Sequence, residues 1–246
     1  MSTDKYLQGL TVYLTGAGGG IGRVIAVDLA KAGARVVIFG ANNKEKANAT
    51  ADMIRNVGGE CITVLGNLTD DKSLLQMFDE AIKLTGGLDI LINNAGIAWS
   101  QPMESTPIEV FDKVMAINAR APYMLSQLCL PYLKKSNRAS IINISSVVAH
   151  AGYPLQSAYV ASKHALLGFT KSLASEVYRD GIRVHAISPG GVFTDMIKVS
   201  RPDLTGEGMI MPEEISDIVT FLLKNRGNAV IDEIIVHRLG KEPFLV

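Results

Sequence analysis

Tyr159 and Lys163 are spaced so that they could carry out proton chemistry together. In Tyr159-Val-Ala-Ser-Lys163 the phenol and the ammonium are four residues apart, which on a helix puts their β-carbons on one face about 6 Å from each other. A tyrosine ordinarily has a pKa of about 10, and a neighbouring cation lowers that pKa. The pair predicts that Tyr159 is a general acid/base and that Lys163 keeps it acidic. The alternative is a surface helix with an incidental Tyr and Lys.

Ser146 places a hydroxyl group thirteen residues before Tyr159, directly after the apolar run 141–144. In an open parallel sheet, ligands bind beyond the carboxyl ends of the strands. Ser146 is therefore predicted to hydrogen-bond a carbonyl or alcohol oxygen of a substrate. Because side chains alternate along a strand, the adjacent Ser145 is expected to turn toward the protein instead.

A glycine-rich turn follows the first predicted strand, with the sequence Thr15-Gly16-Ala17-Gly18-Gly19-Gly20-Ile21-Gly22. Glycines let the backbone approach phosphate groups, and the start of the next helix offers unpaired N–H groups and a partial positive charge. The pattern G-x-G-x-x-G fails, since its last position counted from Gly16 is Ile21, whereas T-G-x-x-x-G-x-G fits. We expect a dinucleotide pyrophosphate here; the alternative is a tight turn before a helix.

These residues are embedded in a regular alternation of apolar and amphipathic segments. Apolar runs predict seven strands, at 10–15, 35–39, 62–65, 89–93, 140–145, 183–188 and 230–236. Amphipathic stretches predict helices at 21–32, 44–57, 72–84, 108–134, 157–178 and 213–224. Strands that are apolar on both faces and separated by helices are typical of a parallel sheet covered on both sides. The expected fold class is α/β, a doubly wound, parallel, seven-stranded Rossmann-type sheet in a single domain over residues 1–246.

Composition narrows the function classes. The chain has 246 residues, is 48% hydrophobic and has a formal net charge of zero, which disfavours a nucleic-acid partner. Its two cysteines, Cys61 and Cys129, indicate buried thiols and neither a disulfide framework nor a metal site. The first residues lack the pattern of a signal peptide, and no apolar run approaches a membrane span. We expect a cytoplasmic protein with no membrane partner.

Together with three further motifs, these residues resemble the short-chain dehydrogenase/reductase family. The further motifs are Asn93-Asn94-Ala95-Gly96, the single Asn118, and Pro189-Gly190-x-Val192-x-Thr194. All of them occur in the family's order and at its usual separations, over nearly the whole chain. The resemblance implies an NAD(P)-dependent oxidoreductase that transfers a hydride between the nicotinamide cofactor and a carbonyl or secondary alcohol substrate, with Tyr159 as general acid/base.

The resemblance also implies a role for each site residue. Ser146 orients the substrate oxygen, Lys163 also holds the nicotinamide ribose, and Asn118 holds a water that links Lys163 to solvent. The implied cofactor contacts are Gly16, Gly18, Gly19, Gly20, Ile21, Gly22, Ala41, Asn42, Asn67, Leu68, Asn94, Ala95, Gly96, Tyr159, Lys163, Pro189, Gly190, Val192 and Thr194. No metal is expected, because none of the four histidines has ligand spacing. The alternative is a non-catalytic dinucleotide-binding regulator or scaffold, which predicts a damaged site.

The residues that normally decide between NAD and NADP in this family are missing from the sequence. Gly40 stands where NAD-preferring relatives carry Asp, and Ala41 stands where NADP-preferring relatives often carry Arg. Without a carboxylate to repel a phosphate, and with Lys44 and Arg23 nearby in sequence, we favour NADP slightly. A solvated Lys44 is the alternative. Asn67 stands where the family usually has Asp, and its amide oxygen is expected to accept a hydrogen bond from the adenine amine.

Several residues outside the family's motifs could shape the substrate site. A short lid of 17 residues, 195–211, suggests an open cleft or a bulky substrate. Trp99, Tyr153 and Phe193 either form an apolar wall or pack their own loops. His150 either contacts a polar substituent or is a surface residue, and His164 should point away from Tyr159. The helices at 108–134 and 157–178 have surplus apolar residues, and in relatives they form a subunit interface, so we expect a homodimer or homotetramer.

Overall fold

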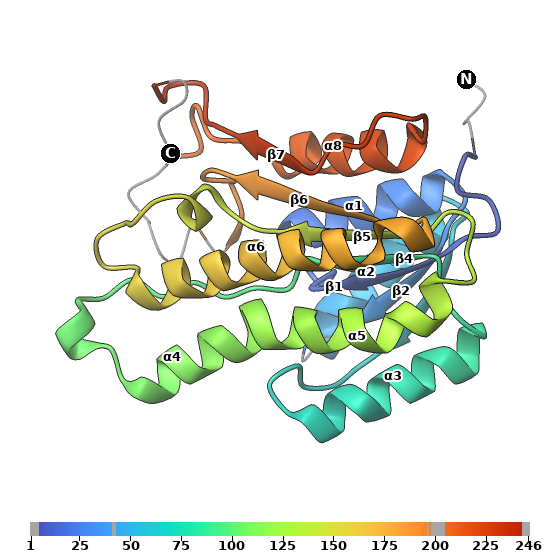
Figure 1. The fold of residues 1–246 in the computed structure, drawn as a ribbon, viewed down its shortest axis with the longest axis horizontal. Helices are drawn as coiled ribbons and strands as arrows, with labels where there is room; N and C mark the ends of the chain where they lie inside the picture. The colour runs from blue at the N-terminus through green and yellow to red at the C-terminus, as the bar shows by residue number, and fades with distance from the viewer. Residues whose placement is uncertain (1–4, 41–42, 196, 198–204, 243–246) are drawn as a thin grey trace.

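The computed structural model describes residues 5–40, 43–195, 197 and 205–242, and it contains one seven-stranded sheet. Every strand pair is parallel and the strand order is β3-β2-β1-β4-β5-β6-β7. The strands are β1 (Thr11–Thr15), β2 (Arg35–Phe39), β3 (Glu60–Val64), β4 (Ile90–Asn93), β5 (Ser140–Ile144), β6 (Arg183–Pro189) and β7 (Glu233–Val236) (Figure 1). The order reverses between β1 and β4, which confirms the predicted doubly wound sheet.

Helices cover both faces of this sheet (Figure 1). One core contains residues of α1 (Gly20–Lys31), α2 (Lys44–Asn56) and α8 (Pro212–Lys224). The other contains residues of α3 (Asp71–Thr85), α5 (Ala121–Leu133) and α6 (Ser157–Val177). Strand β1 shows how alternation supplies both cores, since Val12 and Leu14 belong to the first and Tyr13 to the second.

The predicted helix 108–134 is wrong as one continuous α-helix. It consists of α4 (Ile108–Met115), a π-helical segment η2 (Ala116–Arg120) and α5. Pro122 has no N–H to donate to the carbonyl of Asn118 four residues earlier, which weakens a regular helix at this point. π-Helical segments frequently occur at functional sites, and this one contains Asn118.

Several other boundaries differ from the prediction by a few residues. Strand β7 begins at Glu233 where the apolar run predicted 230, and β3 begins at Glu60 where 62 was predicted. The short 3-10 helices η1 (Met103–Ser105), η3 (Val147–Ala149) and η4 (Tyr178–Asp180) lie in connections that carry no periodic pattern. Both cysteines are free thiols; Cys129 is buried as expected, whereas Cys61 is only part-buried. Within the described part of the chain, no helix has the length and apolar character needed to cross a membrane.

Candidate active site

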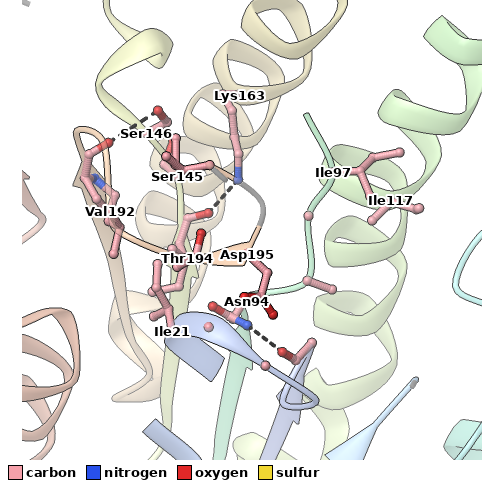
Figure 2. A pocket seen from close by; sticks show the side chains of 18 of the residues that line it. Ile21, Asn94, Ile97, Ile117, Ser145, Ser146, Lys163, Val192, Thr194 and Asp195 are labelled. Carbon is pink, nitrogen blue, oxygen red and sulfur yellow. Dashed lines mark hydrogen bonds between the residues drawn. The ribbon is translucent and has the colours of Figure 1, made fainter. Parts of the chain in front are cut away.

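A cavity of about 460 Å³ opens at the carboxyl ends of the central strands (Figure 2). Its walls come from the segments that follow β1, β2, β3, β4, β5 and β6, together with η2 and α6. The lining residues are Gly16, Gly19, Gly20, Ile21, Gly40, Lys46, Asn67, Leu68, Asn94, Ala95, Gly96, Ile97, Ile117, Ile144, Ser145, Ser146, Tyr159, Lys163, Pro189, Gly190, Val192, Thr194, Asp195 and Ile197. Most of the predicted site residues therefore meet in one cavity.

The glycine loop has the shape that an anionic ligand requires. Gly16 has φ +69°, and a β-carbon there would lie 2.7 Å from the Ala95 α-carbon. At Gly22 a β-carbon would lie 2.4 Å from the carbonyl oxygen of Gly16, so Gly22 supports the turn from behind and does not line the cavity. The residue before α1 is Gly19; no side chain caps this helix, and no acid occupies its first turn. The free N–H groups of α1 fit a pyrophosphate.

Two side chains tie the loop to the neighbouring strand. Thr15 Oγ1 accepts hydrogen bonds from the backbone N–H groups of Asn94 and Ala95, both at 3.0 Å. Asn94 Nδ2 donates back to the carbonyls of Thr15, at 3.0 Å, and Gly16, at 3.2 Å (Figure 2). Asn94 therefore holds the ends of β1 and β4 together, in addition to lining the cavity.

The basic residues at the adenosine end differ from those favoured by sequence. Arg23 donates to the Gly18 carbonyl at 2.7 Å and to Thr50 Oγ1 at 3.3 Å, so it braces the glycine loop from outside the cavity. Lys44 is exposed and does not line the cavity, whereas Lys46, one half-turn further along α2, does. Gly18 lies against Lys46 and does not line the cavity itself. Sequence reasoning missed Lys46 because it assigned proximity from distance along the chain.

The remaining adenosine-end predictions have mixed outcomes. Asn67 and Leu68 line the cavity, and so does Gly40, whose φ of +72° and contact with Leu68 suit glycine. The amide oxygen of Asn67, however, already accepts hydrogen bonds from the Thr69 N–H at 2.9 Å and hydroxyl at 2.8 Å. Both lone pairs of that oxygen are used, which corrects the expectation that it accepts from adenine. Ala41 and Asn42 lie outside the described residues.

Tyr159, Ser146 and Lys163 come together at the other end of the cavity. Ser146 follows β5, is 7% exposed, donates to the Pro189 carbonyl at 3.3 Å, and lies beside the Tyr159 phenol, whose pKa it lowers. Lys163 is 4% exposed and its Nζ lies 5.9 Å from the centre of the Tyr159 ring. The expectation that Ser145 turns away is wrong, because both serines line the cavity, and the buried Ser145 hydroxyl has no hydrogen-bond partner among the described residues.

The pKa of Tyr159 corrects one sequence-based expectation. Burial raises the pKa of the Tyr159 phenol, and the hydrogen bond with Ser146 lowers it only in part. The predicted lowering by Lys163 is therefore not found. Burial also lowers the pKa of Lys163, to about 8. At neutral pH the phenol keeps its proton, a state in which it can donate to an oxygen atom.

Asn118 organises the lysine side of the site. Its amide group exchanges two hydrogen bonds with the backbone of Ile97, each at 2.9 Å, and it donates to Ser162 Oγ at 3.0 Å. Lys163 donates to the Ile144 carbonyl at 2.8 Å (Figure 2). A β-carbon on Gly96 would lie 3.4 Å from Asn118 Oδ1 and 3.7 Å from Lys163 Nζ, so Gly96 lies beside both groups. Asn118 thus fixes the π-helical segment to α6.

The apolar wall is made by other residues than the predicted aromatics. Ile97, Ile117, Ile144 and Val192 line the cavity, and Figure 2 shows Ile97 and Ile117 on the same side of it. The predicted wall residues do not line it: Trp99 and Tyr153 are 37% and 38% exposed, and Phe193 packs against Gly206. Ile97 lies in an irregular connection, where no periodic pattern predicts which way a side chain points. Ile117 lies in the π-helical segment, where the spacing of a regular α-helix does not predict it.

His150 and His164 both lie outside the cavity. His150 is part-buried and its Nε2 lies 2.7 Å from Glu233 Oε1, so it contacts β7 and not the cavity. His164 is exposed, with Nδ1 3.0 Å from the Val160 carbonyl, and points away from the cavity as expected. Among the described residues no His, Cys, Asp or Glu cluster could hold a metal ion.

The fold and the site together define a dinucleotide-dependent enzyme on a doubly wound sheet. The short chain dehydrogenase family model matches residues 10–205 of the chain. The chain belongs to the short-chain dehydrogenase/reductase family, whose members are NAD(P)-dependent oxidoreductases.

Named relatives support this membership. An uncharacterized oxidoreductase of Thermotoga maritima is 41% identical over 183 residues, which cover 74% of this chain and 72% of that protein. A 3-oxoacyl-(acyl-carrier-protein) reductase of Aquifex aeolicus is 34% identical over 238 residues, covering 93% of this chain and 96% of that protein. The solved structure of a metagenomic short-chain oxidoreductase in complex with NADP is 30% identical, with a TM-score of 0.83, and covers 96% of this chain and 100% of its own.

Proposed function

We propose that this enzyme reduces the carbonyl group of a neutral, largely apolar substrate, with NADPH as the cofactor and Tyr159 as the proton donor. The observation that carries the proposal is the convergence of Tyr159, Ser146 and Lys163 on one cavity. The phenol is protonated at neutral pH, since the ordinary tyrosine pKa is about 10 and burial raises the pKa of Tyr159 further, so it can donate a proton in the reductive direction. The isoleucines and valine of the wall favour an apolar substrate body.

The chain's own residues have distinct tasks in this reaction. When bound, the reduced nicotinamide supplies the hydride. Ser146 donates a hydrogen bond to the carbonyl oxygen and orients it toward Tyr159, which transfers its proton as negative charge develops on that oxygen. Lys163, cationic below a pKa of about 8, stabilises the phenolate left behind and holds the nicotinamide ribose. The free N–H groups of α1 would hold the pyrophosphate, and Pro189, Gly190, Val192 and Thr194 the nicotinamide end.

A substrate screen with purified protein tests the proposal. Oxidation of NADPH would be followed against alicyclic and aryl ketones, steroid ketones, β-ketoacyl thioesters and sugars. We expect turnover with ketones whose surroundings are apolar, and little with sugars, whose hydroxyl groups find few partners in this wall. Binding of cofactor without turnover of any carbonyl compound would contradict an enzymatic role and favour a regulator or scaffold.

We infer a preference for NADPH that depends on Lys46. Lys46 lines the cavity and lies against Gly18 of the glycine loop, and the only carboxylate among the described lining residues, Asp195, follows β6. The related metagenomic enzyme was solved with NADP. Lys46→Glu is expected to lower the ratio of kcat/KM for NADPH to that for NADH by about 10- to 100-fold, because it replaces an attraction for the 2′-phosphate with a repulsion.

The matched control for this prediction is Lys44→Glu, since Lys44 lies on the same helix, is exposed and does not line the cavity. The control should leave the ratio within about twofold, because an exposed charge is screened by salt. Equal effects of the two substitutions, or a parent enzyme that prefers NADH, would contradict the role of Lys46.

We further infer that the enzyme is a homo-oligomer that associates through α4, α5 and α6. Tyr123 is 54% exposed, its ring lies 5.2 Å from that of Phe169, and both line a surface groove with Met115 and Ala165. Tyr123→Glu is expected to lower the molar mass measured by light scattering, whereas Tyr178→Glu, at an exposed tyrosine outside this groove, should not. A monomeric parent protein would rule the interface out.

A further inference from the structure

A second cavity, of about 400 Å³, lies at the opposite end of the sheet from Tyr159. Arg183 and His185 line it from the start of β6, whose last residue, Pro189, lines the first cavity. The end of α8 and the segment leading to β7 supply the rest of the lining (Figure 1). The whole length of β6 therefore separates this cavity from the candidate active site.

The lining of this cavity is basic. Arg183, Lys224 and Arg226 contribute side chains, and the described lining residues include neither Asp nor Glu. Arg183 donates to the carbonyls of Asn225 and Gly227. Neutral acceptors of this kind fix a guanidinium group in position without cancelling its charge.

Arg226 is held in the same way. Its Nη1 donates to Ser140 Oγ at 2.7 Å and to the Ala139 carbonyl at 3.0 Å. Burial, followed by the charges of Arg183 and Arg138, lowers the pKa of Arg226 to about 10. Within the described part of the chain, none of these three guanidinium groups pairs with a carboxylate. An anion in the cavity would relieve their mutual repulsion.

His185 gives an independent sign of a ligand. The residue is 2% exposed, and its Nδ1 lies 2.6 Å from the Ile231 carbonyl. Since a carbonyl only accepts, Nδ1 carries a hydrogen. The other ring nitrogen, Nε2, is buried and has no hydrogen-bond partner among the described residues, although His185 lines the cavity. Buried polar atoms are normally satisfied, so this nitrogen lacks the partner that a ligand could supply.

We propose that this cavity binds a compact oxyanion, a phosphate or carboxylate group, between Arg183, Arg226 and His185. Guanidinium groups suit both oxyanions, because their planar N–H pairs match two oxygen atoms. Phe221, Leu222 and Ile231 line the same cavity and would contact an apolar body attached to the anion. The site is distinct from the cofactor cavity and shares no lining residue with it.

Binding should take up a proton at His185. In the neutral ring Nε2 is an acceptor, and only the protonated ring can donate from it to an oxyanion. Burial is the main cause that lowers the pKa of His185; Arg183 and Arg226 also lower it, while the Ile231 carbonyl and Asp232 raise it. A bound anion would raise the pKa of His185 and so counteract the lowering by the two arginines. Affinity is therefore expected to increase as the pH falls toward the ordinary histidine pKa of about 6.5.

Thermal shift and calorimetric titration of the full chain with inorganic phosphate and with benzoate test the proposal. Sodium chloride at equal ionic strength is the reference. We expect a saturable rise in Tm with at least one oxyanion, and a Kd at least tenfold weaker in Arg226→Gln. His185→Asn keeps a donor for the Ile231 carbonyl but loses the titrating nitrogen, so it should abolish most of the pH dependence measured with benzoate, which does not itself titrate near neutral pH. The control is Arg55→Gln, which removes an exposed arginine that does not line this cavity and should leave anion binding unchanged.

Phosphate bound at the glycine loop would be insensitive to all three substitutions, so the comparison separates the two cavities. Tighter binding of phosphate would indicate a phosphorylated ligand, and tighter binding of benzoate an organic carboxylate. If Arg226→Gln fails to fold, Lys224→Gln, at an exposed lining residue, makes the same comparison. The proposal is overturned if neither oxyanion binds more tightly than chloride, or if the folded lining variants bind it as the parent does.

Discussion

Tyr159→Phe is expected to lower kcat for carbonyl reduction by about 1000-fold, because it removes the proton donor and leaves the ring in place. The substitution deletes one hydroxyl group, which lies beside Ser146 in the cavity. Folding should be nearly unchanged, and the Kd for NADPH should change far less than kcat, since the cofactor contacts proposed for the glycine loop do not involve this oxygen. The measurement is steady-state turnover together with a fluorescence titration of NADPH.

Tyr153→Phe is the matched control for this experiment. Tyr153 precedes the same helix, is 38% exposed and does not line the cavity, so its hydroxyl group should be dispensable. If Tyr159→Phe bound NADPH normally and kept more than about a tenth of the parent turnover, another group would have to donate the proton. In that case the Tyr159 hydroxyl would only orient the substrate.

The fold was predictable because its signals are local and repeated. Each buried strand is a short apolar run between polar turns, and parallel strands with helical crossovers leave few possible topologies. The glycine turn was equally readable, since at Gly16 and Gly22 any side chain would collide with backbone atoms. By contrast, Pro122 is a local sign that the helix is weakened near 116–120, but the bonds from Asn118 to Ile97 that fix this segment join residues distant in sequence.

The features that sequence reasoning missed depend on which way a side chain points. Lys44 and Lys46 are equivalent as charges near the cofactor in sequence, but only Lys46 faces the cavity. Arg23 is close to the glycine loop, yet its guanidinium group bonds to Gly18 and Thr50 and does not reach the ligand side. The pKa of Tyr159 was misjudged for a similar reason, since burial of the phenol is a property of the assembled cavity.

Lys163→Met is expected to have opposite effects on turnover and on stability. Turnover should fall about 100-fold or more, because the phenolate formed on Tyr159 loses its neighbouring cation and the nicotinamide ribose loses a contact. Stability at pH 7 should rise, because folding buries the Lys163 ammonium almost completely and lowers its pKa from 10.5 to about 8. A lowered pKa means that folding disfavours the charged form.

The expected gain is about 2 kcal/mol, since each pKa unit corresponds to about 1.4 kcal/mol and roughly 1 kcal/mol is lost with the hydrogen bond to the Ile144 carbonyl. For a chain of this size that corresponds to a rise in Tm of about 5 °C. Lys171→Met, at an exposed position on the same helix, is the control and should change neither turnover nor Tm appreciably.

The pH dependence of the stability gain identifies its cause. Below about pH 8, Lys163 is protonated in both the folded and the unfolded parent chain, so the full penalty for burying its charge is present. Between about 8 and 10.5 the folded chain loses the proton first, and the penalty declines. Above 10.5 neither state is charged and the penalty is gone.

The difference in unfolding free energy between Lys163→Met and the parent should therefore shrink between about pH 8 and pH 10.5 in denaturant titrations. A difference that stays constant with pH would trace the gain to apolar packing of the methionine, and a loss of stability at pH 7 would show that the ammonium is stabilised where it lies.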